Sequence, residues 1–232
     1  MNLVAEATFD LQPIFRLADR KLVGYEALAR WAGRRTEAVL EEARIEGTII
    51  GLDRELGRRA ITEVLPRIPE DMYLSVNVTP ETLASHERTD PFVYGIPYDQ
   101  RVKLVVEITE QSRAEMFAMY DALVHLRSLG IRYAVDDVGS AFGNPFLVGQ
   151  LLPDFIKLDR SLVSRLGDYI VNRANLHGLV VTAQDLNIPV IAEGIETRED
   201  LGWVRHMGVK YGQGFYLGRP APVDEVLGGD SA

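Results

Sequence analysis

Residues Tyr133–Ser140 read YAVDDVGS, an apolar run that ends in two aspartates and a glycine. Strands of a parallel sheet are buried on both faces and read as continuous apolar runs, so this stretch predicts such a strand. Five other stretches have the same form. They are YEALARW (Tyr25–Trp31), SVNVTP (Ser75–Pro80), VVEITE (Val105–Glu110), FIKLDR (Phe155–Arg160) and VIAEGIET (Val190–Thr197).

The six stretches alternate with longer helical patterns, which is typical of a β/α fold. In a β/α barrel the carboxyl ends of the strands converge on one mouth, where the active site lies. The sequence therefore predicts a TIM-type (β/α)8 barrel with polar side chains gathered at its mouth. These are Glu26, Asn77, Glu107, Asp136, Asp137, Lys157 and Glu193.

The carboxylates in this set repel one another if they are all ionised. Two carboxylates 4 Å apart repel by roughly 4 kcal/mol at an effective dielectric constant near 20. They stay ionised together only if cations lie between them, so we expect a metal site with hydrolytic chemistry. Successive strand residues face opposite ways, so Asp136 and Asp137 share a site only if the strand ends there, which Gly139 favours.

The strand and helix patterns extend over most of the chain. The predicted strands are Thr8–Phe15, Leu22–Ala29, Met72–Asn77, Lys103–Thr109, Arg132–Asp136, Phe155–Asp159, Val190–Ala192 and a short one near Gly214–Leu217. The first two are separated by a link around Ala18–Lys21. A parallel crossover needs a dozen or more residues, so this short link predicts an antiparallel hairpin, unlike a regular barrel.

Three helical segments carry clear signals. Gln111–Leu129 opens with the capping-box spacing of Ser112 and Glu115. A second helix opens with Thr197 and Asp200 in the same way and ends at Gly208. The segment Ser161–Leu186 contains two glycines, which leaves open two helices or one weakened helix.

Composition narrows the function classes. The 232 residues fit one barrel domain of about 250 residues, spanning 1–232 with a core of about 8–227. A net charge of −9 argues against a nucleic-acid polymer as partner, because binding to it depends on Lys and Arg. The absence of Cys excludes disulfides and thiolate chemistry. The N-terminus has no signal-peptide pattern and no apolar run long enough to span a membrane, so we expect a cytoplasmic protein.

The ordered motifs resemble the EAL family of cyclic di-GMP phosphodiesterases, which is named after the residues that here are Glu26-Ala27-Leu28. The resemblance runs from about Leu11 to Pro220. It implies a modified barrel whose first strand runs against the others, and hydrolysis of cyclic di-GMP to linear pGpG with Mg²⁺ or Mn²⁺, two ions in all. It also implies a homodimer.

The resemblance assigns roles residue by residue. Glu26, Asn77, Glu107 and Asp136 match ligands of a first metal, and Asp136 bridges to a second beside Asp137. Glu193 matches a residue at the metal and water site that acts as general base, and Lys157 matches the lysine that contacts the attacking water. Further matches contact or support the substrate (Gln12, Leu28, Arg30, Asp159, Glu196 and Gln213) or anchor the loop after Asp137 (Glu110 and Ser140).

The residue types agree with this chemistry without the family. Carboxylate and amide oxygens suit Mg²⁺ or Mn²⁺ rather than Zn²⁺. Arg30 can meet a phosphate with two parallel N–H bonds. The loop Val138–Asn144, however, departs from the family pattern at Val138 and Ala141, which affects the expected second metal and dimer contact.

Two other functions stay open. An EAL-type module that binds cyclic di-GMP or a protein without turnover usually lacks metal ligands, and none is missing here. A barrel glycosidase could use two of the glutamates without a metal, but it would not need Asn77, Lys157 or the Asp136-Asp137 pair.

Overall fold

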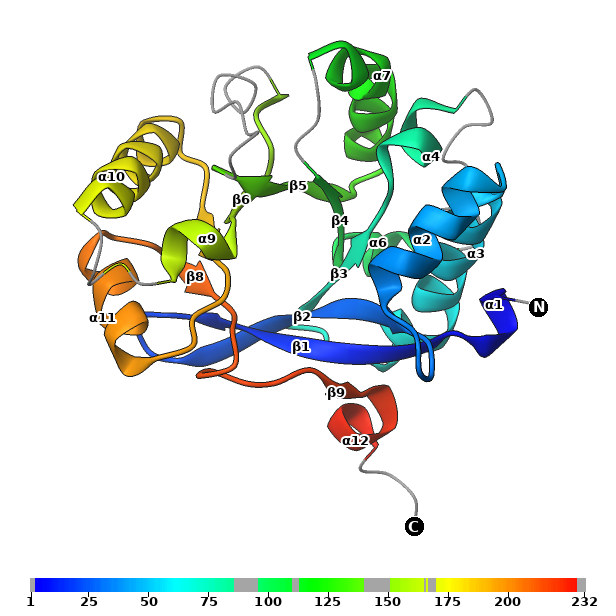
Figure 1. Ribbon diagram of the computed structural model, residues 1–232, viewed down its shortest axis with the longest axis horizontal. Coiled ribbons are helices and arrows are strands. Elements are labelled where there is room, and N and C mark those ends of the chain that lie inside the picture. The colour runs from blue at the N-terminus through cyan, green and yellow to red at the C-terminus, as the bar shows by residue number, and fades with distance from the viewer. Residues whose placement is uncertain are drawn as a thin grey trace.

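The computed structural model describes residues 3–85, 96–109, 113–139, 151–164, 166 and 170–228, with the backbone alone for 109 and 113–118. Within these residues, eight strands close into a barrel (Figure 1). They are β1 (Thr8–Arg16), β2 (Lys21–Arg30), β3 (Tyr73–Asn77), β4 (Leu104–Thr109), β5 (Arg132–Val138), β6 (Phe155–Leu158), β7 (Val190–Ala192) and β8 (Tyr211–Gly212).

One strand runs against the other seven. Neighbouring strands from β2 to β8 pair in parallel. β1 closes the ring by pairing antiparallel with both β2 and β8. The predicted modified barrel and its opening hairpin are therefore confirmed. A short strand, β9 (Ala221–Pro222), pairs with β1 on the outside of the ring.

Helices surround the ring of strands (Figure 1). Those of the described residues are α1 (Leu3–Glu6), α2 (Thr36–Ile45), α3 (Ile49–Arg59), a π-helical turn η1 (Ala60–Val64), a 3₁₀ turn η2 (Leu65–Arg67), α4 (Pro80–Ala84), α6 (Tyr98–Arg101), α7 (Arg113–Ser128), α9 (Arg160–Val163), α10 (Ile170–Asp185), α11 (Arg198–His206) and α12 (Val223–Leu227). Their apolar faces pack on the outside of the strands and form the main core.

The helix predictions have different outcomes. At α11, the Thr197 side chain accepts from the backbone of Asp200, and the Asp200 side chain accepts from the backbone of Thr197, so the capping box is confirmed. The segment Ser161–Leu186 contains two helices, α9 and α10. Helix α7 confirms the predicted helix at 111–129, while its expected cap at Ser112 lies outside the described residues.

The strand predicted near Gly214–Leu217 is wrong, since the last barrel strand is β8, three residues earlier. The backbone N–H groups of Leu217 and Gly218 both donate to the Gly214 carbonyl, so this segment turns instead of extending. A Cβ at Gly214 would lie 2.3 Å from the backbone nitrogen of Ile195. Close contact with the chain after β7 therefore requires a glycine and bends the segment.

An apolar layer inside the barrel supports the mouth. It consists of Ile14, Tyr73, Val105, Ala134, Phe155 and Ile191. The rings of Tyr73 and Phe155 stack with centroids 5.5 Å apart. Side chains two residues apart on a strand share a face. The next inward position on four of these strands is therefore polar, and these residues are Ser75, Glu107, Asp136 and Lys157. Glu193 has the same place in the chain just after β7.

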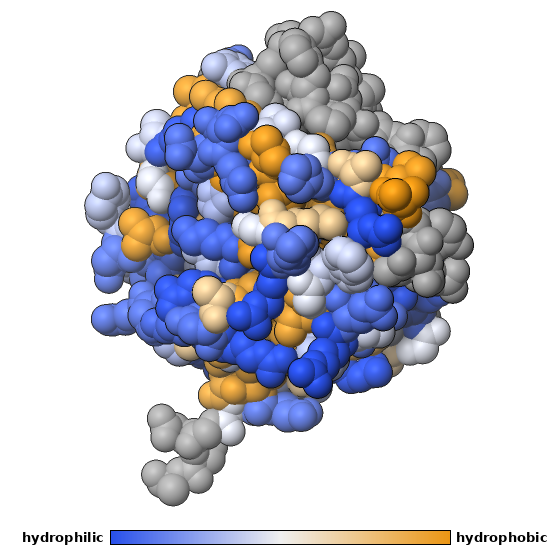
Figure 2. Space-filling view, turned by 90° about the vertical axis from the view of Figure 1, so that its left-hand side faces the viewer, coloured by the Kyte–Doolittle hydropathy of each residue, from blue (hydrophilic) through white to orange (hydrophobic). Residues whose placement is uncertain are grey.

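The outer surface is mostly hydrophilic on the side of α10 and α11, where apolar residues occur in small groups (Figure 2). Scattered exposed apolar residues are normal on folded proteins. No helix among the described residues combines the length and the apolar character needed to cross a membrane.

Candidate active site

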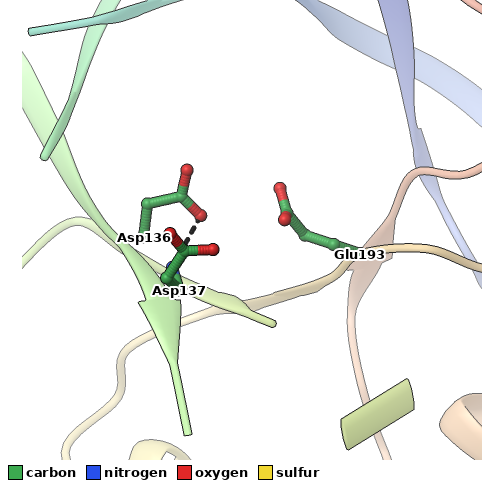
Figure 3. A group of neighbouring side chains, drawn as sticks. All are labelled: Asp136, Asp137 and Glu193. Atoms are coloured by element: carbon green, nitrogen blue, oxygen red, sulfur yellow. Dashed lines mark hydrogen bonds between the residues drawn. The ribbon is translucent and has the colours of Figure 1, made fainter. Parts of the chain in front are cut away.

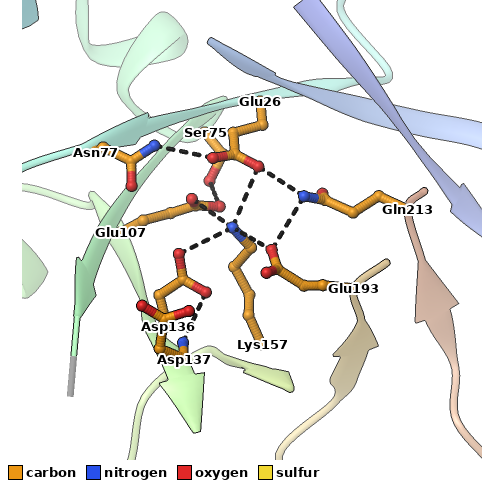
Figure 4. A network of polar contacts seen from close by, with 9 residues as sticks. All are labelled: Glu26, Ser75, Asn77, Glu107, Asp136, Asp137, Lys157, Glu193 and Gln213. Carbon is orange, nitrogen blue, oxygen red and sulfur yellow. Dashed lines mark hydrogen bonds and ion pairs between the residues drawn. The ribbon is translucent and has the colours of Figure 1, made fainter. Parts of the chain in front are cut away.

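The predicted polar residues meet at the carboxyl ends of the strands (Figure 4). Glu26 lies on β2, Asn77 ends β3, Glu107 lies on β4 and Lys157 on β6. Glu193 follows β7, and Gln213 follows β8 directly. The barrel thus brings together residues that are up to 187 positions apart in the chain, as the pair Glu26 and Gln213 shows.

Lys157 is the centre of this group. Its side chain has no exposed surface, although a buried lysine is costly unless it is paired. Its Nζ lies 2.6 Å from Glu107 Oε2, 2.7 Å from Glu193 Oε1, and 3.2 Å from both Glu26 Oε2 and Asp136 Oδ2. One ammonium group therefore contacts four carboxylates, which come from β2, β4, β5 and the residue after β7.

A bulge in β5 turns both aspartates toward the mouth. The register with β6 shifts between Val135 and Val138. Two residues of β5, Asp136 and Asp137, therefore lie opposite one residue of β6, Lys157. Asp137 has a left-handed backbone, with φ of 58°, and its N–H donates to Asp136 Oδ1 at 2.8 Å. The expected strand end at Asp136 is wrong, because β5 continues to Val138. The bulge still allows Asp136 and Asp137 to share one site, because a bulge changes the direction of the side chains on its strand.

Three carboxylates have the spacing of a cation site. One ligand oxygen from each of Asp136, Asp137 and Glu193 lies within 4.8 Å of the others (Figure 3). Asp136 and Asp137 come from β5, and Glu193 reaches toward them from the chain after β7. Hard oxygen donors of this kind suit Mg²⁺, Mn²⁺ or Ca²⁺.

The charge of the group is unbalanced. Five carboxylates, those of Glu26, Glu107, Asp136, Asp137 and Glu193, surround one ammonium group. Burial, with the charges of neighbouring carboxylates, raises the pKa of Glu107 and Glu193 well above the ordinary value. Burial and the charge of Asp136 raise the pKa of Asp137 to about 6. Carboxyls with raised pKa values gain stabilisation from an added cation.

For Glu26 and Lys157, contacts with neighbouring groups outweigh the effect of burial on the pKa. Burial acts to raise the pKa of Glu26, but the charge of Lys157 and hydrogen bonds from Gln213 and Asn77 outweigh it and lower the pKa. Burial acts to lower the pKa of Lys157, but the surrounding carboxylates raise it well above the ordinary value. Lys157 and Glu26 are therefore the most firmly ionised members of the group.

Neutral side chains hold the carboxylates in place. Asn77 Nδ2 donates to Glu26 Oε1 at 2.9 Å. Gln213 Nε2 donates to Glu26 Oε2 at 2.6 Å and to Glu193 Oε1 at 3.0 Å. Gln213 Oε1 is buried without a hydrogen-bond partner among the described residues, which leaves an acceptor in the site.

Ser75 is a site residue that our sequence analysis missed. Its hydroxyl donates to Glu107 Oε1, and the side chain is buried. Ser75 could have been found from its position in SVNVTP. It lies two residues before Asn77, and side chains two residues apart share one face of a strand.

A pocket of about 390 Å³ opens beside the carboxylate group. Glu26, Asn77, Asp136 and Asp137 form one end of it. The rest is lined mainly by β2, α2, α3 and the start of α4, including Leu28, Arg30 and Asp53. The buried Asp53 accepts from the backbone and hydroxyl of Thr79, and sequence analysis gave no signal for it.

Several predicted residues lie outside the polar network. Gln12 stands opposite Glu26 in the β1–β2 register. Asp159 caps α9 by accepting from Ser161 N, and Glu196 pairs with Arg160 at 2.7 Å. Leu28 and Arg30 line the pocket. Glu110 and Ser140 lie outside the described residues, as does the loop from 140 to 150.

Comparison with curated proteins finds signalling enzymes. The chain is 27% identical over 227 residues to the probable cyclic di-GMP phosphodiesterase PdeN of Escherichia coli (strain K12), covering 93% of the chain and 44% of PdeN. It is 25% identical over 231 residues to the cyclic di-GMP phosphodiesterase PdeL of the same organism, covering 94% and 63%. The chain thus spans less than two thirds of the length of either relative.

Comparison with solved structures finds the same barrel. The PaMucR phosphodiesterase in its c-di-GMP complex has a TM-score of 0.85 and 24% identity, covering 95% of the chain and 99% of that chain. Klebsiella pneumoniae BlrP1 in its manganese/cy-diGMP complex has a TM-score of 0.78 and 26% identity, covering 94% and 56%. A family model for the EAL domain matches residues 4–220. The chain therefore belongs to the EAL domain family.

Proposed function

We propose that this protein is a metal-dependent phosphodiesterase that hydrolyses cyclic di-GMP to linear pGpG. The observation that carries the proposal is the group of carboxylates at Lys157, four of them in contact with its ammonium group and Asp137 beside them, next to a pocket lined by Arg30. The family and the names of relatives such as PdeL support this substrate. The barrel as one domain, and a homodimer, are part of the same proposal.

The donor set of the site fits divalent cations. We assign Glu26, Asn77, Glu107 and Asp136 to a first Mg²⁺ or Mn²⁺ ion, and Asp136, Asp137 and Glu193 to a second. All are oxygen donors, and the excess negative charge and raised carboxyl pKa values favour added positive charge. When bound, the ions act as Lewis acids that polarise the phosphoryl group and lower the pKa of water.

Lys157 and Glu193 take the direct roles in the reaction. The buried Nζ of Lys157 supplies a fixed positive charge where negative charge develops on the attacked phosphate. The carboxylate of Glu193 lies beside those of Asp136 and Asp137, where it can accept a proton from the attacking water. The oxygen of that water forms a bond to phosphorus, the bond from phosphorus to the ribose O3′ breaks, and O3′ takes a proton from solvent to become the 3′-hydroxyl. The phosphate then remains on the 5′ oxygen, as in linear pGpG.

The pocket provides the binding surface for the rest of the nucleotide. Arg30 is the cationic side chain of β2 in its lining, and we assign it to a phosphate of the substrate. Leu28 presents an apolar surface beside it. Gln12, Asp159, Glu196 and Gln213 are assigned to contacts with the substrate or with the residues that bind it, and Glu110 and Ser140 to the loop after β5.

The test is incubation of the purified protein with cyclic di-GMP, followed by product analysis. We expect pGpG with Mn²⁺ or Mg²⁺ and none with a chelator. Nucleotide binding is measured in parallel. Binding without product across several metals and pH values would replace the enzyme with a binding module. Metal-independent cleavage of a glycoside would replace it with a glycosidase.

A further inference from the structure

Arg30, near the mouth of the barrel, is held by a residue outside the pocket. Its Nε donates to Asp10 Oδ2 at 3.0 Å. Asp10 lies on β1 opposite Leu28, so Asp10 and Arg30 are diagonal neighbours across the antiparallel hairpin. Long side chains reach each other across such a diagonal. The contact is therefore built into the register of β1 and β2.

Asp10 and the pocket residues of β2 share one face of this hairpin. Residues directly opposite in a pair of strands point to the same side, and so do residues two apart. Asp10 is thus on the side of Glu26, Leu28 and Arg30. All three of those residues line the pocket, and Asp10 does not. Asp10 can therefore affect a ligand in the pocket mainly through Arg30.

The geometry of the contact leaves part of the guanidinium available. A guanidinium has five N–H donors in a planar fork. Asp10 takes the Nε donor, and in the described part of the chain no other side-chain hydrogen bond or ion pair of Arg30 is present. The two Nη groups can then meet two oxygens of a phosphodiester, while the bond from Nε fixes the plane of the fork.

The backbone under Asp10 is held from both sides. Asp10 pairs with Leu28 of β2 and with Pro222 of β9. The Asp10 side chain is 23% exposed and that of Arg30 is 41% exposed, so Asp10 is the more fixed partner. A binding group is positioned best when its supporting residue sits on a rigid element.

We propose that Asp10 is a positioning residue that orients Arg30 toward a phosphate of the bound cyclic dinucleotide. This inference rests on the proposed function and adds to it a residue outside the set predicted from sequence. Asp10 also brings a negative charge near the phosphate, and the ion pair with Arg30 offsets that charge. Orientation is therefore the effect that we expect to dominate.

The test measures kcat and KM for cyclic di-GMP at saturating Mn²⁺. We expect Asp10→Ala to raise KM about threefold to fivefold, the effect of a partly exposed ion pair, with kcat within about twofold of the parent. Asp10→Asn removes the charge but keeps an oxygen that can accept from Nε, so its KM should stay within about twofold. Asp10→Ser replaces Asp10→Ala if the alanine variant is unstable.

A double-mutant cycle shows whether Asp10 acts through Arg30. In an Arg30→Ala background, Asp10→Ala should not raise KM further, because the group that it orients is gone. The matched control is Asp19→Ala. Asp19 accepts from Arg16 Nε at 2.9 Å on the same hairpin, at the end away from the mouth, and its loss should leave KM unchanged.

Three results would overturn the inference while the proposed function stands. They are an unchanged KM for Asp10→Ala, a lowered KM that shows charge repulsion, and an equal rise in KM with and without Arg30. A parent protein that neither binds nor cleaves cyclic di-GMP would instead reject the proposed function, and this inference with it.

Discussion

The Nζ of Lys157 lies 2.6 Å from Oε2 of Glu107, and neither side chain has any exposed surface. Lys157 is on β6 and Glu107 on β4, with β5 between them, so the pair reaches across the interior of the barrel. A buried ion pair is weak evidence for stability, because desolvation of both charges can exceed their attraction. We therefore interpret the pair as serving the proposed reaction more than the stability of the barrel.

Replacing Lys157 by methionine should uncover the repulsion that the lysine offsets. Removal of one partner of a buried ion pair costs about 3–5 kcal/mol in the free energy of unfolding. We expect a loss of this size without metal, measured by urea unfolding, and a larger stabilisation by Mn²⁺ than in the parent. Turnover should be lost while nucleotide binding remains. Near-normal turnover would contradict the role given to Lys157.

Lys21→Met is the matched control for this variant. Lys21 forms an exposed ion pair with Asp71 at 2.9 Å, away from the mouth. An exposed ion pair contributes about 0–1 kcal/mol, so stability should change little and turnover not at all.

Glu26→Ala and Glu193→Gln should separate metal binding from chemistry. Glu26→Ala should lower the affinity for one of the two Mn²⁺ ions by about 100-fold or more, as measured by calorimetry. Loss of a residue that only supports a metal ligand lowers affinity by about 10-fold to 100-fold, so a larger effect indicates a direct ligand. Glu193→Gln keeps an oxygen donor but loses the proton acceptor, so we expect bound nucleotide and little product. Glu63→Ala, which alters an exposed pair with Arg59, serves as control. Equal Mn²⁺ binding in Glu26→Ala and the control would remove Glu26 from the ligand set.

Ser75→Ala tests the residue that sequence analysis missed. The variant leaves the buried Glu107 carboxylate without a hydroxyl donor, which should lower the free energy of unfolding by about 1–3 kcal/mol. Mn²⁺ should bind more weakly, because Glu107 is held less firmly. Ser128→Ala removes an exposed hydroxyl that donates to His125 O and should have neither effect. A Ser75→Ala protein with parental Mn²⁺ affinity would limit Ser75 to a structural role.

Metal binding and metal-free stability should respond to pH with opposite signs. The pKa of Asp137 is raised from 3.8 to about 6, so the folded protein holds its proton over a range where the unfolded chain has lost it. The free energy of unfolding without metal should therefore fall as pH rises through about 4 to 6. The pKa values of Glu107 and Glu193 are also raised, so the free energy of unfolding should continue to fall at higher pH.

Mn²⁺ affinity should rise through the same range, because protons and the metal compete for the carboxylates. Thermal melts from pH 5 to 8, with and without Mn²⁺, measure both trends. Asp137→Asn should weaken the dependence near pH 6. Metal-free stability that rises between pH 5 and 7 would show that these carboxyls are ionised and compensated by other groups.

Much of the barrel and of the site follows from the sequence. Apolar runs ending in Glu26, Asn77, Glu107 or Lys157 predict strands and the mouth on which they converge, because strand ends share one side of a β/α barrel. The short link between β1 and β2 predicts their antiparallel pairing for reasons of chain length alone. The cap of α11 is likewise local, since the side chains of Thr197 and Asp200 accept hydrogen bonds only from groups within four residues of themselves.

Contacts between strands are decided by the tertiary structure. Register and barrel curvature determine that Lys157 meets four carboxylates and that Ser75 reaches Glu107. The bulge that turns Asp137 inward, and the contact with Ile195 that ends the last strand before Gly214, also depend on neighbours distant in sequence. Periodicity places a side chain on a face of its own strand. The partner on another strand is fixed only when the barrel closes, because a shift of one residue would turn the side chain to the opposite face.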